Sequence, residues 1–392
     1  MANILGINLS DLKRNELLKS LDFFLNDSQS HFLVTPNPEI ILRANKDEEY
    51  FYILNSADIA VADGFGLVLA GILRGQLIPR ITGSDLSPWL LSLAERQQFK
   101  TLIINWQDGL STTADISQTL KDRWPKLNFK VLDIAKKETL TVEENNQINL
   151  FEPKLLFTTL GAPLQEKLIW HELKNWPSVR LALAVGGSFD FLTGKMKRAP
   201  KIFRQLGLEW LWRLISQPKR FKRIWRATIV FGFKAANSII VQPFLFRSNV
   251  ANILYKKTES GLKILLVARQ DDHQHWQLPQ GGTDGQKLKV AGARELREEL
   301  NTDKFIVKKT FNNLHVYSFS KKGLHTERAG YKGQKQGLLI AEFTGTDDDI
   351  KINYWDHFAW QWIDVDKFLE TTDIYRREGY QKFLTKFLET VK

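Results

Sequence analysis

Apolar and polar positions follow two kinds of pattern along the first half of the chain. Six short runs have the composition of buried strands: residues 31–35, 57–62, 101–105, 129–132, 155–160 and 181–185. Three longer stretches repeat apolar residues at helical spacing: residues 86–97, 112–123 and 165–175. Alternating strands and helices predict an α/β fold with a parallel sheet. Ligands of such sheets bind beyond the carboxyl ends of the strands, so we expect the chemistry in the loops at residues 35–39, 63–66 and 161–165.

The pattern changes near residue 247, where a second set of elements begins. Residues 251–256 and 262–268 have the composition of two strands that form a hairpin. A glycine-rich loop and a charged helix follow, and then further strands and a C-terminal helix. A chain of 392 residues has room for two or three domains, and we expect a separate domain over residues 247–392.

Basic residues are concentrated between these two halves. Residues 195–234 contain twelve Lys or Arg residues and one acid, Glu209, so this segment carries a net charge equal to the +11 of the whole chain. Arg226 and Lys234 interrupt the mostly apolar run 224–246, and aromatic residues are interleaved with the bases. Such a segment is a poor membrane-spanning helix but suits a helix lying in the interface of an anionic bilayer. Nucleic-acid binding and packing on its own domain are the alternatives.

Composition narrows the class of protein. Hydrophobic residues make up 43% of the chain, which excludes a disordered or low-complexity protein. The chain has no cysteine, which excludes disulfides, thiolate metal sites and a cysteine nucleophile and favours a reducing compartment. Residues 1–18 carry acids and bases where a signal peptide needs an apolar run. We therefore expect a cytoplasmic protein.

A first group of polar residues lies in the loops that the strand pattern singles out. Asp63 follows an apolar run and precedes Gly64, so a carboxylate meets a backbone that a ligand can approach closely. Neutral and cationic groups suited to sugar hydroxyls and phosphates are Thr35, Asn37, Arg80 and Gln165. Each is ordinary by itself, because an Asp-Gly pair is more often only a turn.

Six sequence blocks, in order, resemble the WecG/TagA/CpsF glycosyltransferase family over about residues 1–245. These blocks are TPNPE, SADIAVADGFGLVLA, RITGSDL, LGAPLQEK, AVGGSFDFLTGKMKRAP and GLEWLWRL. The resemblance implies a Rossmann-like core over residues 1–194 and a basic appendage over 195–246 that closes over the site and contacts the membrane. It also implies inverting transfer of a sugar, typically N-acetylmannosamine, from UDP to a polyprenyl-diphosphate-linked amino sugar. Such an enzyme would be peripheral on the inner face of the cell membrane.

The same resemblance implies roles for individual residues. Asp63 would be the general base on the acceptor hydroxyl, with Thr35, Asn37, Arg80 and Gln165 around donor and acceptor. The appendage would bring Arg213, Arg220 and Arg223 to the diphosphate, or these residues would serve only in attachment to lipid. We expect no cofactor for this domain, since it has no Asp-x-Asp metal motif, and arginines and backbone amides would stabilise the leaving UDP. The chain departs from the family at residues 105–109, where Trp106 would fill room for a nucleotide base.

A second group of residues lies on the charged helix of the C-terminal half. Glu295, Glu298 and Glu299 are spaced i, i+3 and i+4, so they share one helix face and suit a hard cation such as Mg²⁺. The alternative is a solvated acidic face. Residues 281–302 resemble the Nudix box, and the flanking WQLPQGG and YKGQKQ are similar to the branch of RNA pyrophosphohydrolases and diadenosine polyphosphate hydrolases.

The Nudix resemblance implies an α/β/α domain that hydrolyses, with Mg²⁺, a nucleoside diphosphate linked to another group. All three glutamates would hold the metal, with Glu298 and Glu299 catalytic, and the polyphosphate would meet Lys332, Gln334, Lys335 and Gln336. Three departures stand out: Gln286 replaces a glutamate in a loop one residue short, Asn301 replaces a glycine at the helix end, and His357-Phe358 replaces Glu-Phe beside Asp356. Asn tolerates the left-handed conformation of such a cap.

Together these features favour a bifunctional enzyme, a membrane-associated glycosyltransferase fused to a Nudix hydrolase. Its expected partners are a UDP-sugar, a polyprenyl-diphosphate-linked acceptor, an anionic membrane surface, and a nucleoside polyphosphate or RNA 5′ end. Two other interpretations stay open: an RNA 5′-end pyrophosphohydrolase whose basic segment binds RNA, and a protein with one degenerate domain that only senses nucleotides. Assembly into a homo-oligomer is also left open.

Overall fold

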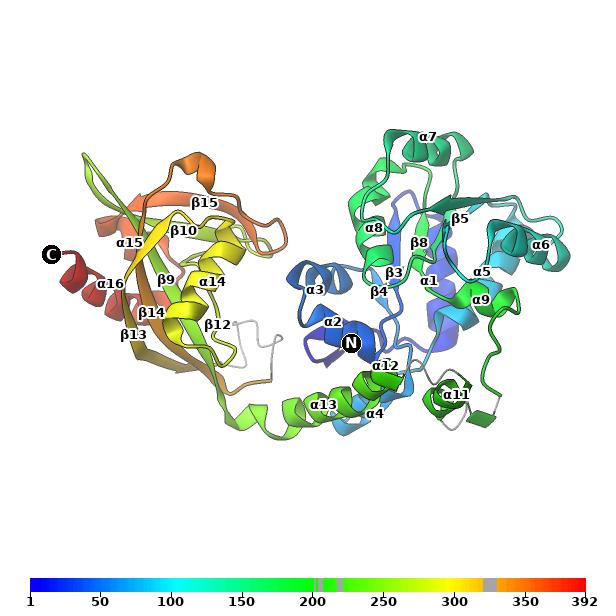
Figure 1. Cartoon of the computed structure of the whole chain (residues 1–392), viewed down its shortest axis with the longest axis horizontal. Coiled ribbons are helices and arrows are strands. Elements are labelled where there is room, and N and C mark those ends of the chain that lie inside the picture. Colours follow the sequence, from blue (N-terminus) through cyan, green and yellow to red (C-terminus); the bar gives the residue numbers. More distant parts are fainter. Residues whose placement is uncertain (201, 204–206, 217–220, 320–329) are drawn as a thin grey trace. The chain divides into compact units, whose positions relative to one another are not determined.

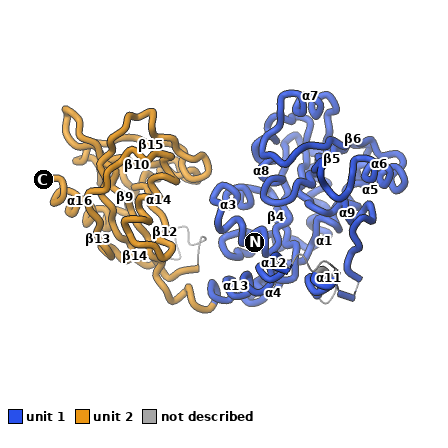
Figure 2. Tube along the Cα trace, viewed as in Figure 1, with its two compact units in different colours: residues 1–239 blue, residues 240–392 orange. Residues whose placement is uncertain are grey.

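The computed structural model describes residues 1–392 except 201, 204–206, 217–220 and 320–329. The chain forms two compact units, residues 1–239 and 240–392 (Figure 2). The division between them falls inside the basic segment 195–246, near its C-terminal end. Each unit has its own buried core, so each is described by itself.

Unit 1 is built on a six-stranded sheet whose strand order is β4-β3-β8-β7-β5-β6. All of its pairings are parallel, which confirms the predicted parallel sheet. The strands are β3 (His31–Val34), β4 (Ile59–Ala60), β5 (Thr101–Trp106), β6 (Phe129–Ile134), β7 (Leu155–Thr158) and β8 (Leu181–Ala184). The six strands correspond to the six predicted runs, although β5 extends one residue and β6 two residues beyond the predicted end. Strands of a parallel sheet that are buried on both faces are almost continuously apolar.

Helices cover both faces of this sheet (Figure 1). One face packs against α1 (Arg14–Asn26), α5 (Gly83–Gln97), α6 (Thr113–Arg123) and α9 (Ser188–Leu192). The other face packs against α2 (Pro38–Ala44), α3 (Glu48–Asn55), α4 (Phe65–Leu73), α7 (Val142–Phe151), α8 (Leu164–Glu172) and the small hairpin of β1 (Ala2–Ile4) and β2 (Ile7–Leu9). Successive strand residues alternate between these two cores, as Phe32 and Leu33 do.

The described part of the basic segment is mostly helical, and most of it belongs to unit 1. It contains α11 (Glu209–Ser216), α12 (Phe221–Trp225), the π-helical turn η3 (Arg226–Val230) and α13 (Phe231–Ile240). Within the described residues, one helix, Phe221–Phe244, is long and apolar enough to cross a membrane. Phe231, Ala235 and Ser238, at i, i+4 and i+7 on α13, are nevertheless buried, and the first two belong to the unit 1 core. One face of this helix is therefore occupied by its own domain.

Unit 2 contains a seven-stranded mixed sheet. Its main path is β11-β10-β9-β14-β13, with β12 paired to β9 and β15 paired to β10. The strands are β9 (Phe246–Thr258), β10 (Gly261–Arg269), β11 (Trp276–Gln277), β12 (Gln280–Gly282), β13 (Phe305–Ser318), β14 (Gly333–Phe343) and β15 (His357–Asp364). β9 and β10 pair antiparallel, which confirms the predicted hairpin, whereas β9 and β14 are parallel.

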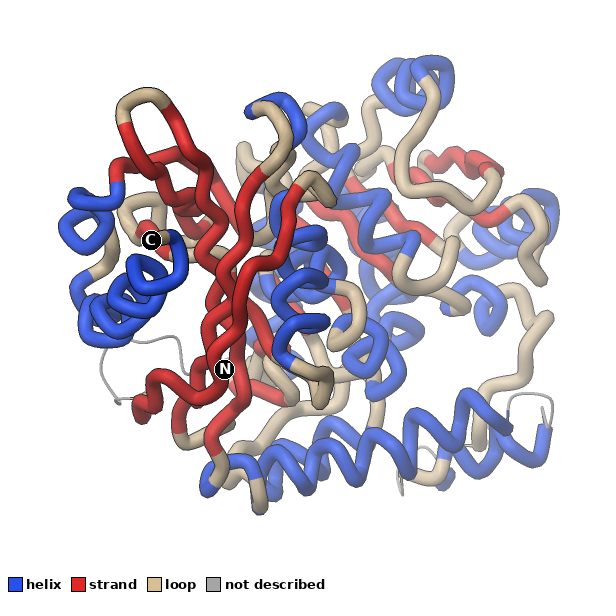
Figure 3. Tube along the Cα trace, turned by 60° about the vertical axis from the view of Figure 1, so that its left-hand side comes forward, coloured by secondary structure: helices blue, strands red, loops and turns tan. Residues whose placement is uncertain are grey.

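Two helices cover opposite faces of the unit 2 sheet (Figure 3). Leu296 and Leu300 of α14 (Leu288–Leu300) pack on one face. Phe383 and Phe387 of α16 (Arg377–Val391) pack on the other, which gives the predicted α/β/α layers. Asn301 ends α14 with φ of 48°, the left-handed cap expected for it.

Candidate active sites

Loops at the carboxyl ends of β3 and β4 bring together four of the residues predicted for the first site. The Asp63 N–H donates to the Pro36 carbonyl at 2.8 Å, which joins the two loops. Ala62 forms an isolated parallel β-bridge with Arg80. Arg80 therefore lies directly beside the strand end that carries Asp63. Gly64, with φ of +140°, lies against Asn37 and Pro38, and a Cβ there would come within 3.0 Å of the proline ring.

Thr35 and Asn37 are partly engaged by the fold. The buried Thr35 hydroxyl donates to the Ala184 carbonyl at 3.3 Å and so links β3 to β8. The side-chain oxygen of Asn37 caps α2 by accepting from the N–H groups of Glu39 and Ile40, each at 3.0 Å. These contacts hold the loop after β3 in place. This loop includes Pro36, whose carbonyl accepts from the backbone N–H of Asp63.

Arg80 is paired with a residue that the sequence did not single out. Its guanidinium lies 2.5 Å from the carboxylate of Glu209, the first residue of α11. The two side chains are 21% and 14% exposed, so water screens the pair only partly. One feature of the sequence could have indicated a role for Glu209: it is the only acid among the twelve bases of residues 195–234. The pair ties the basic segment to the candidate site.

A second ion pair links the basic segment to α2. The Arg223 guanidinium contacts the Glu39 carboxylate, which also accepts from Arg43 at 2.8 Å. Arg43 in turn donates to the Ala162 carbonyl at 2.6 Å, in the loop between β7 and α8. The side chain of Arg213 and all of Arg220 lie outside the described residues. Of the three predicted arginines, Arg223 is thus located beside the loops of the site.

Gln165 holds two loops together. Its side-chain oxygen accepts from the N–H of Gly161 at 3.1 Å and from that of Gly186 at 3.0 Å, across the loops after β7 and β8. Its amide group donates to Glu166 at 2.8 Å. Complete burial raises the pKa of Glu166 to about 7. A direct role of Gln165 in substrate binding stays a prediction.

Trp106, the departure noted after β5, has a cation on its ring. The Lys136 ammonium lies 3.5 Å from the ring centroid, within the range of a cation–π contact. The backbone N–H of Trp106 donates to the Thr159 hydroxyl at 3.3 Å, and the ring packs partly on the core. One face of this ring is therefore taken by lysine at the carboxyl edge of the sheet.

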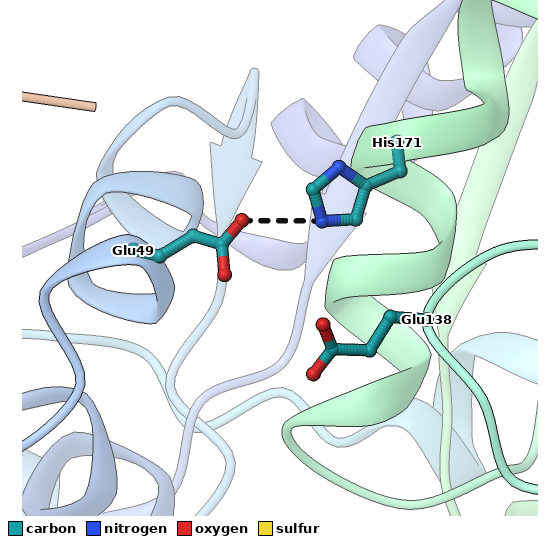
Figure 4. Close-up of side chains that lie close together, drawn as sticks. All are labelled: Glu49, Glu138 and His171. Carbon is teal, nitrogen blue, oxygen red and sulfur yellow. Dashed lines mark ion pairs between the residues drawn. The ribbon is translucent and has the colours of Figure 1, made fainter. Parts of the chain in front are cut away.

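Away from these loops, Glu49, Glu138 and His171 bring their ligand atoms within 4.8 Å of one another (Figure 4). Among the described residues, this is the one group of three such side chains that converges to metal-binding distance. The Lys167 ammonium already lies 2.7 Å from Glu49 and 3.1 Å from Asp47. Because an ammonium neutralises these carboxylates, the cluster is explained as a charge network between α3 and α8.

In unit 2 the three predicted glutamates lie on α14, and two of them contact one arginine. Arg294 lies 2.8 Å from Glu295 and 2.5 Å from Glu298, and it donates to the Gly282 carbonyl at 2.7 Å. Burial disfavours the charge of this guanidinium, yet the carboxylates raise the pKa of Arg294 overall. Its Nε donates to Gln286 at 3.1 Å. Gln286 therefore keeps a hydrogen bond to the arginine but brings no negative charge.

Glu299 makes a different set of contacts. Both of its carboxylate oxygens lie within 3.3 Å of the Gln280 N–H, and one is 3.2 Å from Nε2 of the buried His357. Glu295 packs against Gly281, where a Cβ would come within 1.9 Å of the carboxylate. The carboxylates of Glu295 and Glu299 lie against the segment Gln280–Gly282, and carboxylate oxygens are ligands that suit Mg²⁺. Glu298 contacts Arg294, as Glu295 does, and the three glutamates are not among the described groups that converge to metal-binding distance.

The residues predicted to meet a polyphosphate divide between the two faces of the sheet. Gln334 accepts from the Tyr317 hydroxyl at 2.7 Å, and the buried Gln336 donates to Asn249 and Gln280, each at 3.0 Å. By strand alternation these two glutamines share the face of Leu338, which packs toward α16, whereas Lys335 shares the face of Leu339, which packs toward α14. Lys332 is exposed before the strand, near the Phe246 ring. Of the strand residues, Lys335 is the one on the glutamate side.

A polar cluster on the α16 side was not foreseen from the sequence. His275 accepts from Arg376 at 3.1 Å, and its other ring nitrogen lies 3.3 Å from Asp373. Burial, followed by the positive charge of Arg376, lowers the pKa of His275. These residues lie 101 positions apart along the chain, so no local pattern could have paired them.

Comparison with known proteins agrees with the architecture of both units. The family model described as "Glycosyl transferase WecG/TagA/CpsF family" matches residues 2–243. The chain belongs to this family. A curated relative from Staphylococcus aureus strain MRSA252, N-acetylglucosaminyldiphosphoundecaprenol N-acetyl-beta-D-mannosaminyltransferase, is 31% identical over 243 residues, covering 60% of this chain and 92% of the relative. The protein of the same description from strain MW2 gives the same values.

The second unit matches a different model, the NUDIX domain, over residues 245–385. A solved Ap4A hydrolase from Caenorhabditis elegans is 20% identical with a TM-score of 0.27, and covers 37% of this chain and 99% of its own. The dihydroneopterin triphosphate pyrophosphohydrolase of Escherichia coli is 18% identical with a TM-score of 0.29, and covers 36% and 99%. This member of the WecG/TagA/CpsF family is thus an enzyme in which a glycosyltransferase and a Nudix hydrolase share one chain.

Proposed function

We propose that unit 1 transfers an N-acetylmannosamine-type sugar from a UDP donor to a polyprenyl-diphosphate-linked amino sugar. The observation that carries the proposal is the position of Asp63, held by the Pro36 carbonyl beside Arg80 at the carboxyl edge of the sheet. The relatives that share 31% of their residues with this chain act, by name, on a diphosphoundecaprenol-linked N-acetylglucosamine with an N-acetylmannosaminyl group.

In the proposed reaction, the Asp63 carboxylate accepts the proton of the acceptor hydroxyl as that oxygen attacks the anomeric carbon. The bond between this carbon and the UDP oxygen breaks, and UDP leaves with the electron pair, so the configuration inverts. Arg80 and Arg223 would then exchange Glu209 and Glu39 for phosphate oxygens, since charge-assisted bonds to arginine are the strongest available to a diphosphate. Arg213 and Arg220 would join them from the same appendage.

We propose further that the appendage keeps unit 1 on the inner face of the cell membrane as a peripheral protein. Trp225 and Phe233 are 50% and 76% exposed, and the bases Lys222, Arg226 and Lys234 are exposed on the same helix. The opposite face of α13 is buried in the domain, which favours a helix parallel to the bilayer over one that crosses it. Exposed aliphatic and aromatic side chains favour lipid over RNA as the partner of this segment.

For unit 2 we propose Mg²⁺-dependent hydrolysis of a nucleoside diphosphate bonded to a further group. Glu295, Glu298 and Glu299 would hold the ion after Glu298 leaves Arg294. When bound, Mg²⁺ would neutralise phosphate charge and lower the pKa of a bound water. Lys335 would meet the polyphosphate on the α14 side, and Gln334 with the exposed Lys332 would meet the rest of the substrate. A dinucleoside polyphosphate or a 5′-triphosphate RNA suits this set better than UDP.

One experiment tests both activities on the full chain. The purified protein is incubated with a panel of UDP-sugars and a short-chain polyprenyl-diphosphate amino sugar, and separately with dinucleoside polyphosphates and triphosphorylated RNA. Products are resolved by mass, with Mg²⁺ and with EDTA. We expect sugar transfer in both conditions and hydrolysis only with Mg²⁺. No transfer to any acceptor, or hydrolysis that survives EDTA, would contradict the respective proposal.

A further inference from the structure

The helix that follows the candidate base exposes apolar side chains to solvent. In α4, Leu67, Ala70 and Gly71 are buried, whereas Leu69, Ile72 and Leu73 are 47%, 50% and 62% exposed. The exposed three are spaced i, i+3 and i+4, so they form one stripe on the side where a surface helix normally carries polar residues. Leu77, just beyond the helix, is 82% exposed. Contiguous exposed apolar residues of this kind mark a surface that another phase or molecule covers.

This stripe lies next to the basic segment. A Cβ on Gly66 would come within 3.6 Å of the Phe231 ring of α13, and Arg74 donates to the Ser238 hydroxyl at 3.4 Å. At its other end, Phe65 packs so closely on Gly207 that no side chain fits there. Figure 1 shows α4, α11, α12 and α13 together along the lower border of unit 1. The exposed stripe of Leu69, Ile72 and Leu73 therefore extends the apolar and basic surface of the appendage.

Charge identifies the kind of partner. Residues 65–77 and 221–239 contain no acid, and they contain the bases Arg74, Lys222, Arg223, Arg226 and Lys234. Two apolar segments whose charged residues are all cations are complementary to anionic phospholipid, in which acyl chains lie directly beneath negative headgroups. A nine-residue helix is roughly 14 Å long. It is too short to cross a hydrocarbon core of about 30 Å, so it would lie in the interface.

We propose that α4 inserts Leu69, Ile72 and Leu73 into the headgroup–acyl boundary of an anionic bilayer, as a second membrane element beside the appendage. Asp63 precedes α4 by two residues, so insertion holds the candidate base at the level of the headgroups. Resting on the proposed transferase activity, this places the acceptor diphosphate within reach of the base while its polyprenyl chain stays in the membrane.

The absence of cysteine from the chain permits a direct test of insertion. Ile72→Cys is labelled with an environment-sensitive fluorophore and mixed with vesicles of phosphatidylcholine and phosphatidylglycerol, or of phosphatidylcholine alone. We expect a blue shift with the anionic vesicles. Leu150→Cys on α7, a residue 84% exposed and remote from this border, is the matched control and should show none. A label on Ile72→Cys that stays in water while the protein sediments with anionic vesicles overturns the proposal, as does a protein that binds no vesicles.

A second set of variants measures how much α4 contributes. Leu69→Gln/Ile72→Gln/Leu73→Gln should lower the vesicle partition coefficient about tenfold or more, whereas Val142→Gln/Leu150→Gln on α7 should leave it unchanged. The triple variant should keep its circular dichroism and its transfer to a short-chain acceptor in solution. If instead the wild type is a dimer and the triple variant a monomer with unaltered vesicle binding, α4 is a protein interface and the proposal is wrong. Insertion without any sugar transfer would refute the proposed function and leave this inference standing.

Discussion

Arg80 and Glu209 form a half-buried ion pair of 2.5 Å across 129 residues of sequence. Arg80 lies beside the strand end that carries the candidate base, and Glu209 begins α11 in the basic segment. The pair therefore gives the appendage one defined position on unit 1. A segment with twelve bases would otherwise have repelled this cation.

Breaking this pair should loosen the appendage. In a double-mutant cycle with Arg80→Gln and Glu209→Gln, we expect a coupling of about 1 kcal/mol in the free energy of unfolding, since partial burial limits screening. Urea unfolding of the four full-length proteins measures it. Additive effects of the two substitutions would mean that the pair does not hold the appendage.

Asp63→Asn should abolish sugar transfer. An amide cannot take the acceptor proton, so we expect a loss of about a hundredfold or more in kcat with donor binding nearly unchanged. Transfer rates and UDP-sugar titration check the two parts. Asp122→Asn, on the exposed side of α6, is the control and should transfer normally. Full activity of Asp63→Asn would remove this residue from the mechanism.

Glu166 should make the stability of unit 1 depend on pH. Burial raises the pKa of Glu166 from 4.5 to about 7, so the folded state holds a proton that the unfolded chain releases. The stability due to this protonated carboxyl is complete below about pH 4.5 and is lost as the pH rises through about 7. Between pH 5.5 and 8 the loss should be on the order of 2 kcal/mol. Urea unfolding of wild type and Glu166→Gln should show this extra slope in the wild type alone.

Removal of the metal or of one of its ligands should abolish hydrolysis by unit 2 and leave sugar transfer by unit 1 unchanged. We expect EDTA, Glu298→Gln or Glu299→Gln to cut hydrolysis of a dinucleoside polyphosphate about a hundredfold or more, because the ion loses a negatively charged ligand. Sugar transfer by the same preparations should be unchanged. Glu259→Gln, in an exposed turn, is the matched control. Hydrolysis that persists in Glu299→Gln would exclude it as a ligand.

Gly281→Ala tests the packing of Glu295 without altering any charge. The added methyl group would lie 1.9 Å from the Glu295 carboxylate, so that side chain must move. We expect Mg²⁺ affinity, measured by calorimetry, to fall about tenfold or more while the domain stays folded. Gly232→Ala, where an added Cβ would meet no atom within 4 Å, should leave the Mg²⁺ affinity unchanged.

The sequence was informative where burial dictates composition. The parallel sheet was predictable because most of its strands are apolar on both faces, with the partly exposed β6 as the exception. The helix α4 was not predicted, since the nearly all-apolar run Phe65–Leu73 has no periodicity to separate a helix from a strand. The partners Glu209 and Arg376 were missed because their contacts join distant parts of the chain. Strand alternation alone would have predicted that Gln334 and Lys335 lie on opposite faces of the sheet.

Gln165 has a mechanical consequence for the site. One side-chain oxygen accepts from both Gly161 and Gly186, so a movement of Gln165 that releases one loop also weakens the bond that holds the other. The two loops should therefore open as one cooperative unit, and their amides should exchange with deuterium at a common rate. A substrate that orders either loop would thereby stiffen both, although it touches only one.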